Sequence, residues 1–104
     1  MSNYDTIEVR QEICSDWYIN ESVLEGCKIL YSNYTYEDYS GSGYVLFVRD
    51  GKLYEVHGSH CSCYGLEDQW SEEETFPEAI FHHMNKGYWE GIDVQYVSEV
   101  LIAL

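Results

Sequence analysis

Positively charged residues are scarce in this sequence. Five Lys and Arg stand against 19 Asp and Glu, which gives a formal net charge of −14 over 104 residues. From Leu53 onward, ten carboxylates are balanced by Lys86 alone. Direct binding to nucleic-acid phosphates or to an anionic membrane depends on Lys and Arg, so both functions are disfavoured. The partners that remain are a cation and a basic protein surface, including one built to hold nucleic acid. An acidic surface also keeps a small protein soluble without any partner.

Long apolar segments are missing as well. A membrane-spanning helix needs about 20 apolar residues, and no run of this kind occurs. The chain does not open with the charged and then apolar pattern of a secretory signal. The four cysteines, at positions 14, 27, 61 and 63, therefore indicate reduced thiols in a cytoplasmic protein. A disulfide between Cys61 and Cys63 would be strained.

Apolar and aromatic residues are plentiful. The hydrophobic content of 45% supports one folded domain over residues 1–104 rather than a disordered chain. Eleven Tyr and three Trp are an unusual number for this length. Such side chains are enriched at protein interfaces, and they also fill small cores with their polar atoms at the edge. We expect both uses here.

The clearest element is a β-hairpin. Two strand-like runs, 44–49 and 52–57, flank Asp50-Gly51, a pair typical of the type I′ turn. A two-residue turn places Arg49 opposite Lys52 and Tyr44 opposite His57. Because side chains alternate between faces, one face carries Val45, Phe47, Tyr54 and Val56 and is the better core face. The mixed face carries Tyr44, Leu46, Val48, Leu53, Glu55 and His57.

Four further elements complete the expected fold. Residues 27–36 are predicted to form a strand, and the Gly- and Ser-rich residues 37–43 a loop. A helix over 75–86 has a capping-box spacing at Thr75 and Glu78 and an apolar stripe that includes His83. A second helix over 93–104 has Asp93 as its N-cap, and the spacing of Val9, Ile13 and Trp17 favours a helix within 6–24. The prediction is an α+β fold, with a three-stranded antiparallel meander (27–36, 44–49, 52–57) packed against these helices.

A segment rich in His and Cys follows the hairpin and is the candidate metal site. An extended strand would separate His57 and Cys61 by about 13 Å, too far for one metal. A bend at Gly58-Ser59 could bring the ligands together around zinc, although the spacing is not that of a standard zinc motif. The candidate zinc ligands are His57, His60, Cys61 and Cys63. The alternative is that the cysteines are small buried thiols and His57 is a hydrogen-bonded residue at the rim.

The same segment allows two other interpretations. A Cys beside a His has the residue types of a nucleophilic pair, but acidic surroundings raise a thiol pKa, so we do not expect an enzyme. An aromatic pocket near the cysteines could instead sequester a small, nucleotide-like ligand, although Lys and Arg are few. If the helix over 75–86 packs across the sheet, His82 or His83 would approach this segment.

Residues 67–75 are predicted to form an acidic loop around Trp70. We expect Trp70 to pack back onto the sheet; the alternative is that it binds a ligand. The three consecutive glutamates lack the pattern of a calcium loop. Together with exposed aromatics, they make a candidate partner-binding surface. Its proposed members are Tyr34, Tyr36, Tyr39, Trp70, Glu72, Glu73, Glu74 and Trp89.

The sequence after the hairpin also carries a resemblance. Gly58-Ser-His-Cys-Ser-Cys-Tyr-Gly-Leu-Glu67, followed by Gln69-Trp70 and Glu73-Glu-Thr75, resembles small uncharacterised acidic proteins of bacteriophages and prophages. The resemblance covers roughly residues 28–87. Those proteins usually have a Pro between the Trp and the Glu pair, where this chain has Ser71-Glu72. The resemblance implies phage origin and action in the cytoplasm of an infected bacterial cell. It implies no catalytic or binding residue.

These observations lead to one main functional hypothesis. A very acidic, tyrosine-rich phage protein suits binding to a basic site on a host protein, such as a nucleic-acid-acting or defence protein, which it would inhibit or modulate. Direct nucleic-acid and membrane partners are not expected. A homodimer is a further expectation, since a sheet edge and exposed aromatics favour self-association.

Overall fold

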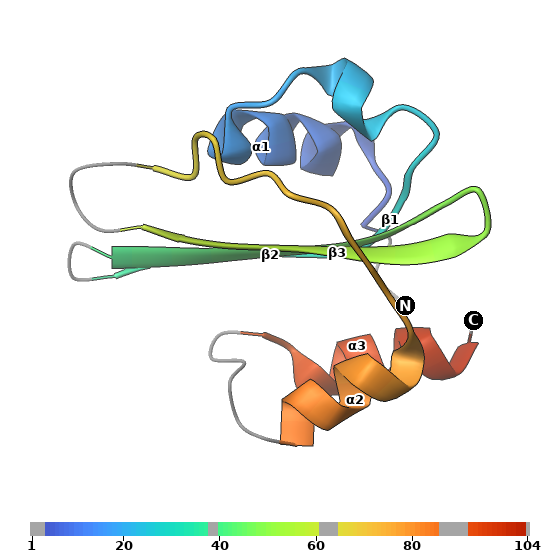
Figure 1. The fold of residues 1–104 in the computed structure, drawn as a ribbon. Helices are drawn as coiled ribbons and strands as arrows, with labels where there is room; N and C mark the ends of the chain where they lie inside the picture. The colour runs from blue at the N-terminus through green and yellow to red at the C-terminus, as the bar shows by residue number, and fades with distance from the viewer. Residues whose placement is uncertain (1–3, 38–39, 61–64, 86–91, 104) are drawn as a thin grey trace.

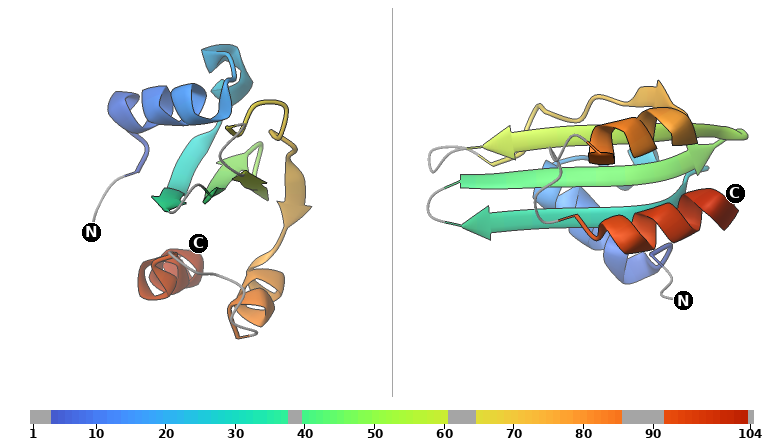
Figure 2. Two further views of the ribbon diagram at one scale, coloured as in Figure 1. Left: turned by 90° about the vertical axis from the view of Figure 1, so that its left-hand side faces the viewer. Right: turned by 90° about the horizontal axis from the view of Figure 1, so that it is seen from below.

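A computed structural model describes residues 4–37, 40–60, 65–85 and 92–103. The fold is α+β and has three layers, with an antiparallel sheet in the middle (Figure 1). Helix α1 (Ile7–Trp17) and the 3₁₀-helix η1 (Glu21–Leu24) cover one face of the sheet. Helices α2 (Pro77–Asn85) and α3 (Val94–Ala103) cover the other, as both views of Figure 2 show.

The sheet has four strands rather than the three predicted. In the order β1-β2-β3-β4 these are Lys28–Glu37, Ser40–Arg49, Lys52–His60 and Glu73–Thr75. The predicted loop over 37–43 is wrong, because β2 already begins at Ser40 and pairs with β1. The predicted acidic loop over 67–75 is wrong at its end, where β4 pairs with Leu53–Glu55 of β3. Glycine and glutamate both have low strand propensity, so neither extension was visible from composition.

The predicted hairpin is confirmed in its turn and its register. Asp50 and Gly51 both have positive φ, at 54° and 76°, as a type I′ turn requires. Arg49 pairs with Lys52, and Tyr44 pairs with His57. Beyond the predicted ends, the ladder continues to Gly41 and His60.

Both faces of the hairpin are core faces. The face predicted to be the better one packs against α1, where Val45, Phe47 and Val56 are fully buried. The mixed face packs against α2 and α3, where Leu46 and Leu53 are also buried. A β-bulge in β1 lies between Ile29, which pairs with Phe47, and Tyr31, which pairs with Leu46.

Helix α1 lies within the predicted range 6–24 and has the predicted core positions. The Thr6 side chain caps it by accepting a hydrogen bond from the backbone N–H of Val9 at 3.1 Å. Ile13 and Trp17 are buried on the sheet, and Val9 packs against the same cluster. The helix ends at Tyr18, which has a left-handed backbone conformation.

Trp17 rests on a pair of glycines in the sheet. Gly43 and Gly58 are directly opposite each other on β2 and β3. A Cβ at Gly58 would lie 2.7 Å from a Trp17 ring carbon, and a Cβ at Gly43 would lie 2.8 Å from another. Glycine inside a strand commonly marks such a close approach. The absence of side chains at these glycines therefore lets the indole ring pack directly on the strands, and the glycines do not belong to a loop.

The two C-terminal helices differ in how well their starts were predicted. Helix α2 begins at Pro77, the position that suits a proline, and Thr75 belongs to β4, so the predicted capping box is wrong. Helix α3 has the predicted cap, since the Asp93 carboxylate accepts from the N–H of Tyr96 at 3.0 Å. Val97, Val100 and Leu101 are buried as expected, whereas Val94 is exposed and Leu104 lies outside the described residues.

Several tyrosines have structural roles at this end of the core. The Tyr31 hydroxyl accepts a hydrogen bond from the backbone N–H of Asp93 at 2.9 Å and thereby holds the start of α3 on the sheet. The rings of Tyr31 and Tyr96 each lie 5.1 Å from the ring of Tyr4. Part of the tyrosine content is thus explained by packing.

No helix in the described part of the chain combines the length and the apolar character needed to cross a membrane.

Candidate functional site

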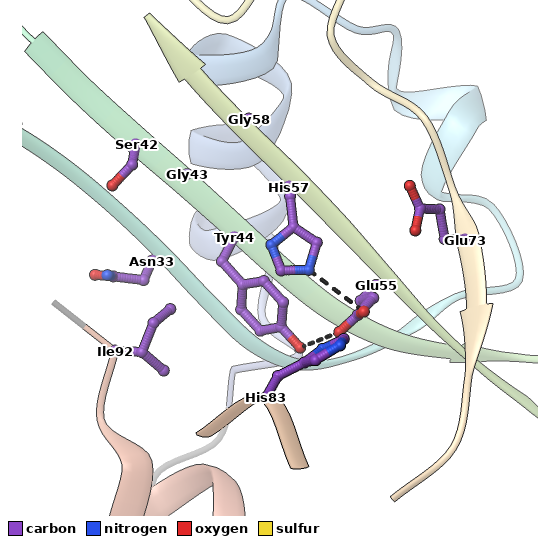
Figure 3. A pocket seen from close by; sticks show the side chains of 10 residues that line it. All are labelled: Asn33, Ser42, Gly43, Tyr44, Glu55, His57, Gly58, Glu73, His83 and Ile92. Atoms are coloured by element: carbon purple, nitrogen blue, oxygen red, sulfur yellow. Dashed lines mark hydrogen bonds and ion pairs between the residues drawn. The ribbon is translucent and has the colours of Figure 1, made fainter. Parts of the chain in front are cut away.

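A pocket lies between the sheet and the helices α2 and α3. It has a volume of about 380 Å³, within the range of small-ligand sites. Its walls come from all four strands, from α2 and from the residue before Asp93 (Figure 3). The residues that line it are Asn33, Ser42, Gly43, Tyr44, Glu55, His57, Gly58, Glu73, His83 and Ile92.

A buried carboxylate lies at the centre of this pocket. Glu55 is 4% exposed and is the one buried charged residue in the described part of the chain. Its carboxylate accepts a hydrogen bond from the Tyr44 hydroxyl at 3.0 Å and lies 3.3 Å from His57 Nε2 (Figure 3). The hairpin register brings the three together, because Tyr44 and His57 are directly opposite and their rings are 4.8 Å apart.

The surroundings of Glu55 keep it ionised. Burial raises the pKa of its carboxyl, but the hydrogen bond and charge of His57 lower it. The Tyr44 hydrogen bond and the charge of His83 lower it further, so the pKa of Glu55 lies below its ordinary value. Burial, followed by the charge of Glu55, raises the pKa of the Tyr44 hydroxyl, which therefore stays protonated as a donor.

A second carboxylate also lines the pocket. Glu73 of β4 is directly opposite Glu55 of β3, so both side chains point to the same face of the sheet. Both line the pocket, and none of the described residues on its walls is a Lys or an Arg. His57 and His83 are the histidines among these described residues. The pocket is therefore suited to a positively charged group and poorly suited to an anion.

The structure separates the predicted metal ligands that it describes. The chain does not bend at Gly58-Ser59, because β3 continues to His60. His57 faces the pocket, while His60 points to the α1 side and hydrogen-bonds the Tyr34 hydroxyl. Cys61 and Cys63 lie outside the described residues. Within the described ranges, no three His, Cys, Asp or Glu side chains are grouped to hold a metal ion.

The candidate partner-binding residues are dispersed. Trp70 packs onto the sheet, with its ring 5.4 Å from that of Trp17 and 6.2 Å from that of Phe47. Glu72 is engaged by Arg49, and Glu73 and Glu74 are exposed on the edge strand β4. Tyr34 is half-buried. The side chains of Tyr36, Tyr39 and Trp89 lie outside the described residues.

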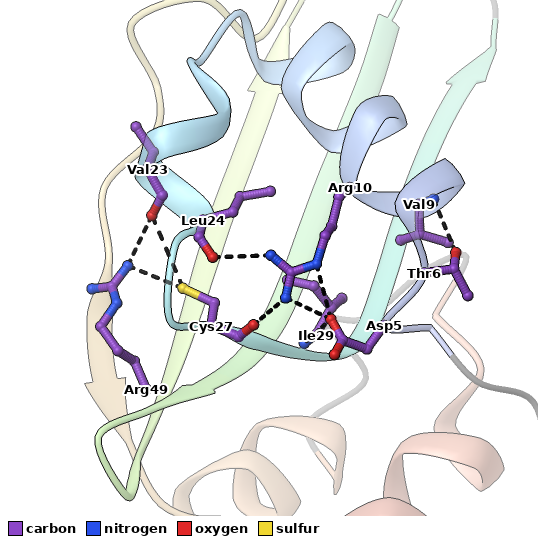
Figure 4. A network of polar contacts seen from close by, with 9 residues as sticks. All are labelled: Asp5, Thr6, Val9, Arg10, Val23, Leu24, Cys27, Ile29 and Arg49. Atoms are coloured by element: carbon purple, nitrogen blue, oxygen red, sulfur yellow. Dashed lines mark hydrogen bonds and ion pairs between the residues drawn. The ribbon is translucent and has the colours of Figure 1, made fainter.

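Both arginines are used inside the protein, as Figure 4 shows for one end of the sheet. Arg10 pairs with Asp5 at 2.7 Å and donates to the carbonyls of Leu24 and Cys27. Arg49 makes two hydrogen bonds to the Glu72 carboxylate, at 2.7 and 3.0 Å. Arg49 also donates to the Val23 carbonyl and to Cys27 Sγ, at 3.0 and 3.1 Å. These contacts fasten η1 to the sheet.

The pocket was only partly visible in the sequence. Tyr44, Glu55 and His57 were placed together on the mixed face of the hairpin. His82 or His83 was expected to approach the segment over 57–63, and His83 lines the pocket together with His57 and Gly58, the first two residues of that segment. The signal that would have found the site is Glu55 itself, a carboxylate inside an apolar strand. The partner Glu73 depends on β4, which was not predicted.

Comparisons with protein-family models, with curated proteins and with solved structures find no match for this chain.

The lowered pKa of Glu55 leads to a prediction about acid stability. A depressed pKa contributes stability that is present above the ordinary glutamate pKa of about 4.3 and is lost as the pH falls through the lower folded-state pKa. Glu55→Gln should reduce the free energy of unfolding at pH 7 by about 1.5 kcal/mol. In urea titrations, the difference in the free energy of unfolding between wild type and Glu55→Gln should become smaller below about pH 4.

Glu99→Gln supplies the control for this measurement. Glu99 is exposed on α3, and its substitution changes the net charge equally. Because the Glu99 side chain is exposed, Glu99→Gln should leave the free energy of unfolding at pH 7 within about 0.5 kcal/mol of wild type. A gap for Glu55→Gln that does not narrow in acid would show that Glu55 is not held ionised by its neighbours.

Proposed function

We propose that this chain is an acidic interaction protein that binds a basic surface on another protein. In keeping with the resemblance to phage proteins, the partner would be a protein of an infected bacterial cell, and binding would inhibit or modulate it. The observation that carries the proposal is the internal use of both arginines. Lys28 and Lys52 are then the described basic residues left on the surface, against a large excess of exposed carboxylates.

Helix α1 offers the most regular part of this acidic surface. Glu8, Glu12 and Asp16 lie four residues apart and thus follow one side of the helix, about 6 Å apart along its axis. Burial, and then the charge of Glu12, raises the pKa of Asp16. Like charges at this spacing destabilise a helix. A row of carboxylates that lowers the stability of its own helix is expected on a surface that binds a basic partner.

Apolar side chains lie beside these carboxylates. Ile7 at the start of α1 is 71% exposed, and Tyr18 just after its end is 67% exposed. Glu21 and Glu25 flank a groove between α1 and η1 that Ile7 and Leu24 also line. Exposed apolar anchors surrounded by charge are typical of protein-binding surfaces, where the charge sets the association rate and the anchors hold the complex.

The proposal predicts binding that weakens with salt and with loss of the α1 carboxylates. A partner recovered from bacterial extract should bind at least about tenfold more weakly at 0.5 M than at 0.05 M salt, because electrostatic steering is screened. Glu8→Gln with Glu12→Gln should slow association about threefold or more in surface plasmon resonance. Double-stranded DNA should compete if the partner's basic surface normally holds nucleic acid.

The matched control for this experiment is the pair Glu78→Gln with Glu99→Gln. It changes the net charge equally, but both residues are exposed on α2 and α3, on the opposite side of the sheet. Its effect on association should be clearly smaller. If high salt and both pairs of substitutions leave the association rate unchanged, charge does not direct the interaction and the proposal fails.

A further inference from the structure

We propose that the pocket between the sheet and α2/α3 binds the ammonium or guanidinium group of a small organic cation, between Glu55 and Glu73. The site lies on the opposite side of the sheet from α1, so the inference does not depend on the proposed function. The group would come from a free small molecule or from a Lys or Arg side chain of another protein. The chemistry of recognition is the same in both cases.

The paired carboxylates are the first reason. Glu55 and Glu73 are directly opposite each other on β3 and β4 and both line the pocket, and none of the described lining residues is a Lys or an Arg. A cation in the pocket would meet negative charge from both strands and would gain charge-assisted hydrogen bonds.

The second reason is that the ionised carboxylate is built into the core. The side chain of Glu55 is 5% exposed and is held by Tyr44 from one side and by His57 from the other. A buried carboxylate is costly unless it is compensated. The Tyr44 and His57 contacts provide this compensation and fix the carboxylate in place on the pocket wall. A guanidinium or ammonium group in the pocket would gain a charge-assisted hydrogen bond to it.

The third reason is the shape of the pocket. Figure 3 shows Glu73 at one end and Asn33, Ser42 and Ile92 at the other, with Tyr44 and His57 between them. The Tyr44 ring offers an aromatic face to a cation beside Glu55. Asn33 and Ser42 supply neutral hydrogen-bonding groups for a polar tail. The pocket thus suits a short molecule with a positive head and a polar end.

Other ligand classes fit less well. An anion or a nucleotide phosphate would meet two carboxylates and, among the lining residues that the structure describes, no Lys or Arg. A metal ion needs several ligands converging on one point, and the described His, Asp and Glu side chains show no such group. An organic cation needs only the negative charge, the aromatic wall and the enclosed volume.

The test is a titration with agmatine, which carries both a guanidinium and an ammonium group, followed by two-dimensional NMR at low salt. Wild-type protein should show saturable shifts at the backbone amides of residues 42–44 and 55–58. Glu73→Gln should weaken binding about fivefold, and Glu55→Gln about tenfold or more, since each removes one charged partner. Glu73 is exposed on β4, so its substitution leaves the core unchanged and tests the site even if Glu55→Gln alters folding.

Glu99→Gln controls for the change in net charge and should leave agmatine affinity within twofold of wild type. A second titration with Nα-acetyl-arginine amide distinguishes the sources. Equal or tighter binding of this probe assigns the pocket to a protein side chain, and binding of agmatine alone assigns it to a free molecule. The proposal is overturned if agmatine and the arginine probe both give no saturable shifts at millimolar concentration, or if Glu99→Gln weakens binding as much as Glu73→Gln.

Discussion

Gly58→Ala is expected to lower the free energy of unfolding by about 3 kcal/mol, the upper part of the usual cost of overpacking a core. The new Cβ would lie 2.7 and 2.8 Å from two Trp17 ring carbons and 3.0 Å from Leu66 Cδ2. Trp17 and Leu66 are fully buried, so neither can move aside cheaply. Urea denaturation followed by tryptophan fluorescence measures the loss.

Ser59→Ala is the matched control, because Ser59 is the next residue of β3 and its side chain is exposed. Its effect should stay within about 0.5 kcal/mol. Gly58→Ala should also lower the free energy of unfolding by less in a Trp17→Leu background, because the ring that the new Cβ would contact is absent. This double-mutant cycle isolates the contact. Equal stability of the Gly58→Ala and Ser59→Ala variants would show that the indole does not rest on Gly58.

This contact also explains where prediction from the sequence ended. The turn and the register of the hairpin were predictable, since Asp50-Gly51 defines the turn and the turn fixes the register. The strand character of residues 40–43 and 58–60 was not predictable, because Gly43 and Gly58 accommodate the ring of Trp17, a residue of α1. A local pattern cannot reveal a requirement set by a distant side chain.

The candidate site shows the same limit. The hairpin alone predicted that Tyr44, Glu55 and His57 share a face. It could not predict that helices bury this face, nor that β4 sets Glu73 opposite Glu55. Three consecutive glutamates are typical of a solvated loop, and only tertiary contacts make two of their positions a strand edge. The negative charge of the pocket therefore depends on the tertiary structure, which could not be predicted from the local sequence around each glutamate.

Arg49→Met is expected to lower the free energy of unfolding by about 2 kcal/mol. The Arg49 guanidinium joins three segments, because it contacts Glu72 before β4, the Val23 carbonyl of η1 and Cys27 Sγ before β1. Removal leaves the half-buried Glu72 carboxylate without its main partner. The cost stays below the roughly 3–5 kcal/mol of a fully buried pair, because the Arg49 and Glu72 side chains are 26% and 21% exposed.

Arg49→Lys should lose about half as much, since an ammonium keeps the charge but cannot bond Glu72 and the Val23 carbonyl with one planar group. Lys52→Met is the control for loss of a positive charge, because Lys52 is exposed and pairs directly with Arg49 across the hairpin. Its effect on the urea midpoint should be small.

Thermodynamic coupling to Glu72 decides whether the ion pair is responsible for this stabilisation. The pKa of Glu72 is lowered, first by the hydrogen bond from Arg49, with a further hydrogen bond from Trp70. Glu72→Gln combined with Arg49→Met should therefore cost less than the sum of the two single variants, by about 1 kcal/mol. Strict additivity would mean that the two side chains act independently, and an Arg49→Met variant as stable as Lys52→Met would mean that the guanidinium does not hold η1 to the sheet. The same cycle bears on function, because an Arg49 freed from Glu72 would add a positive charge to the surface that we propose is kept acidic.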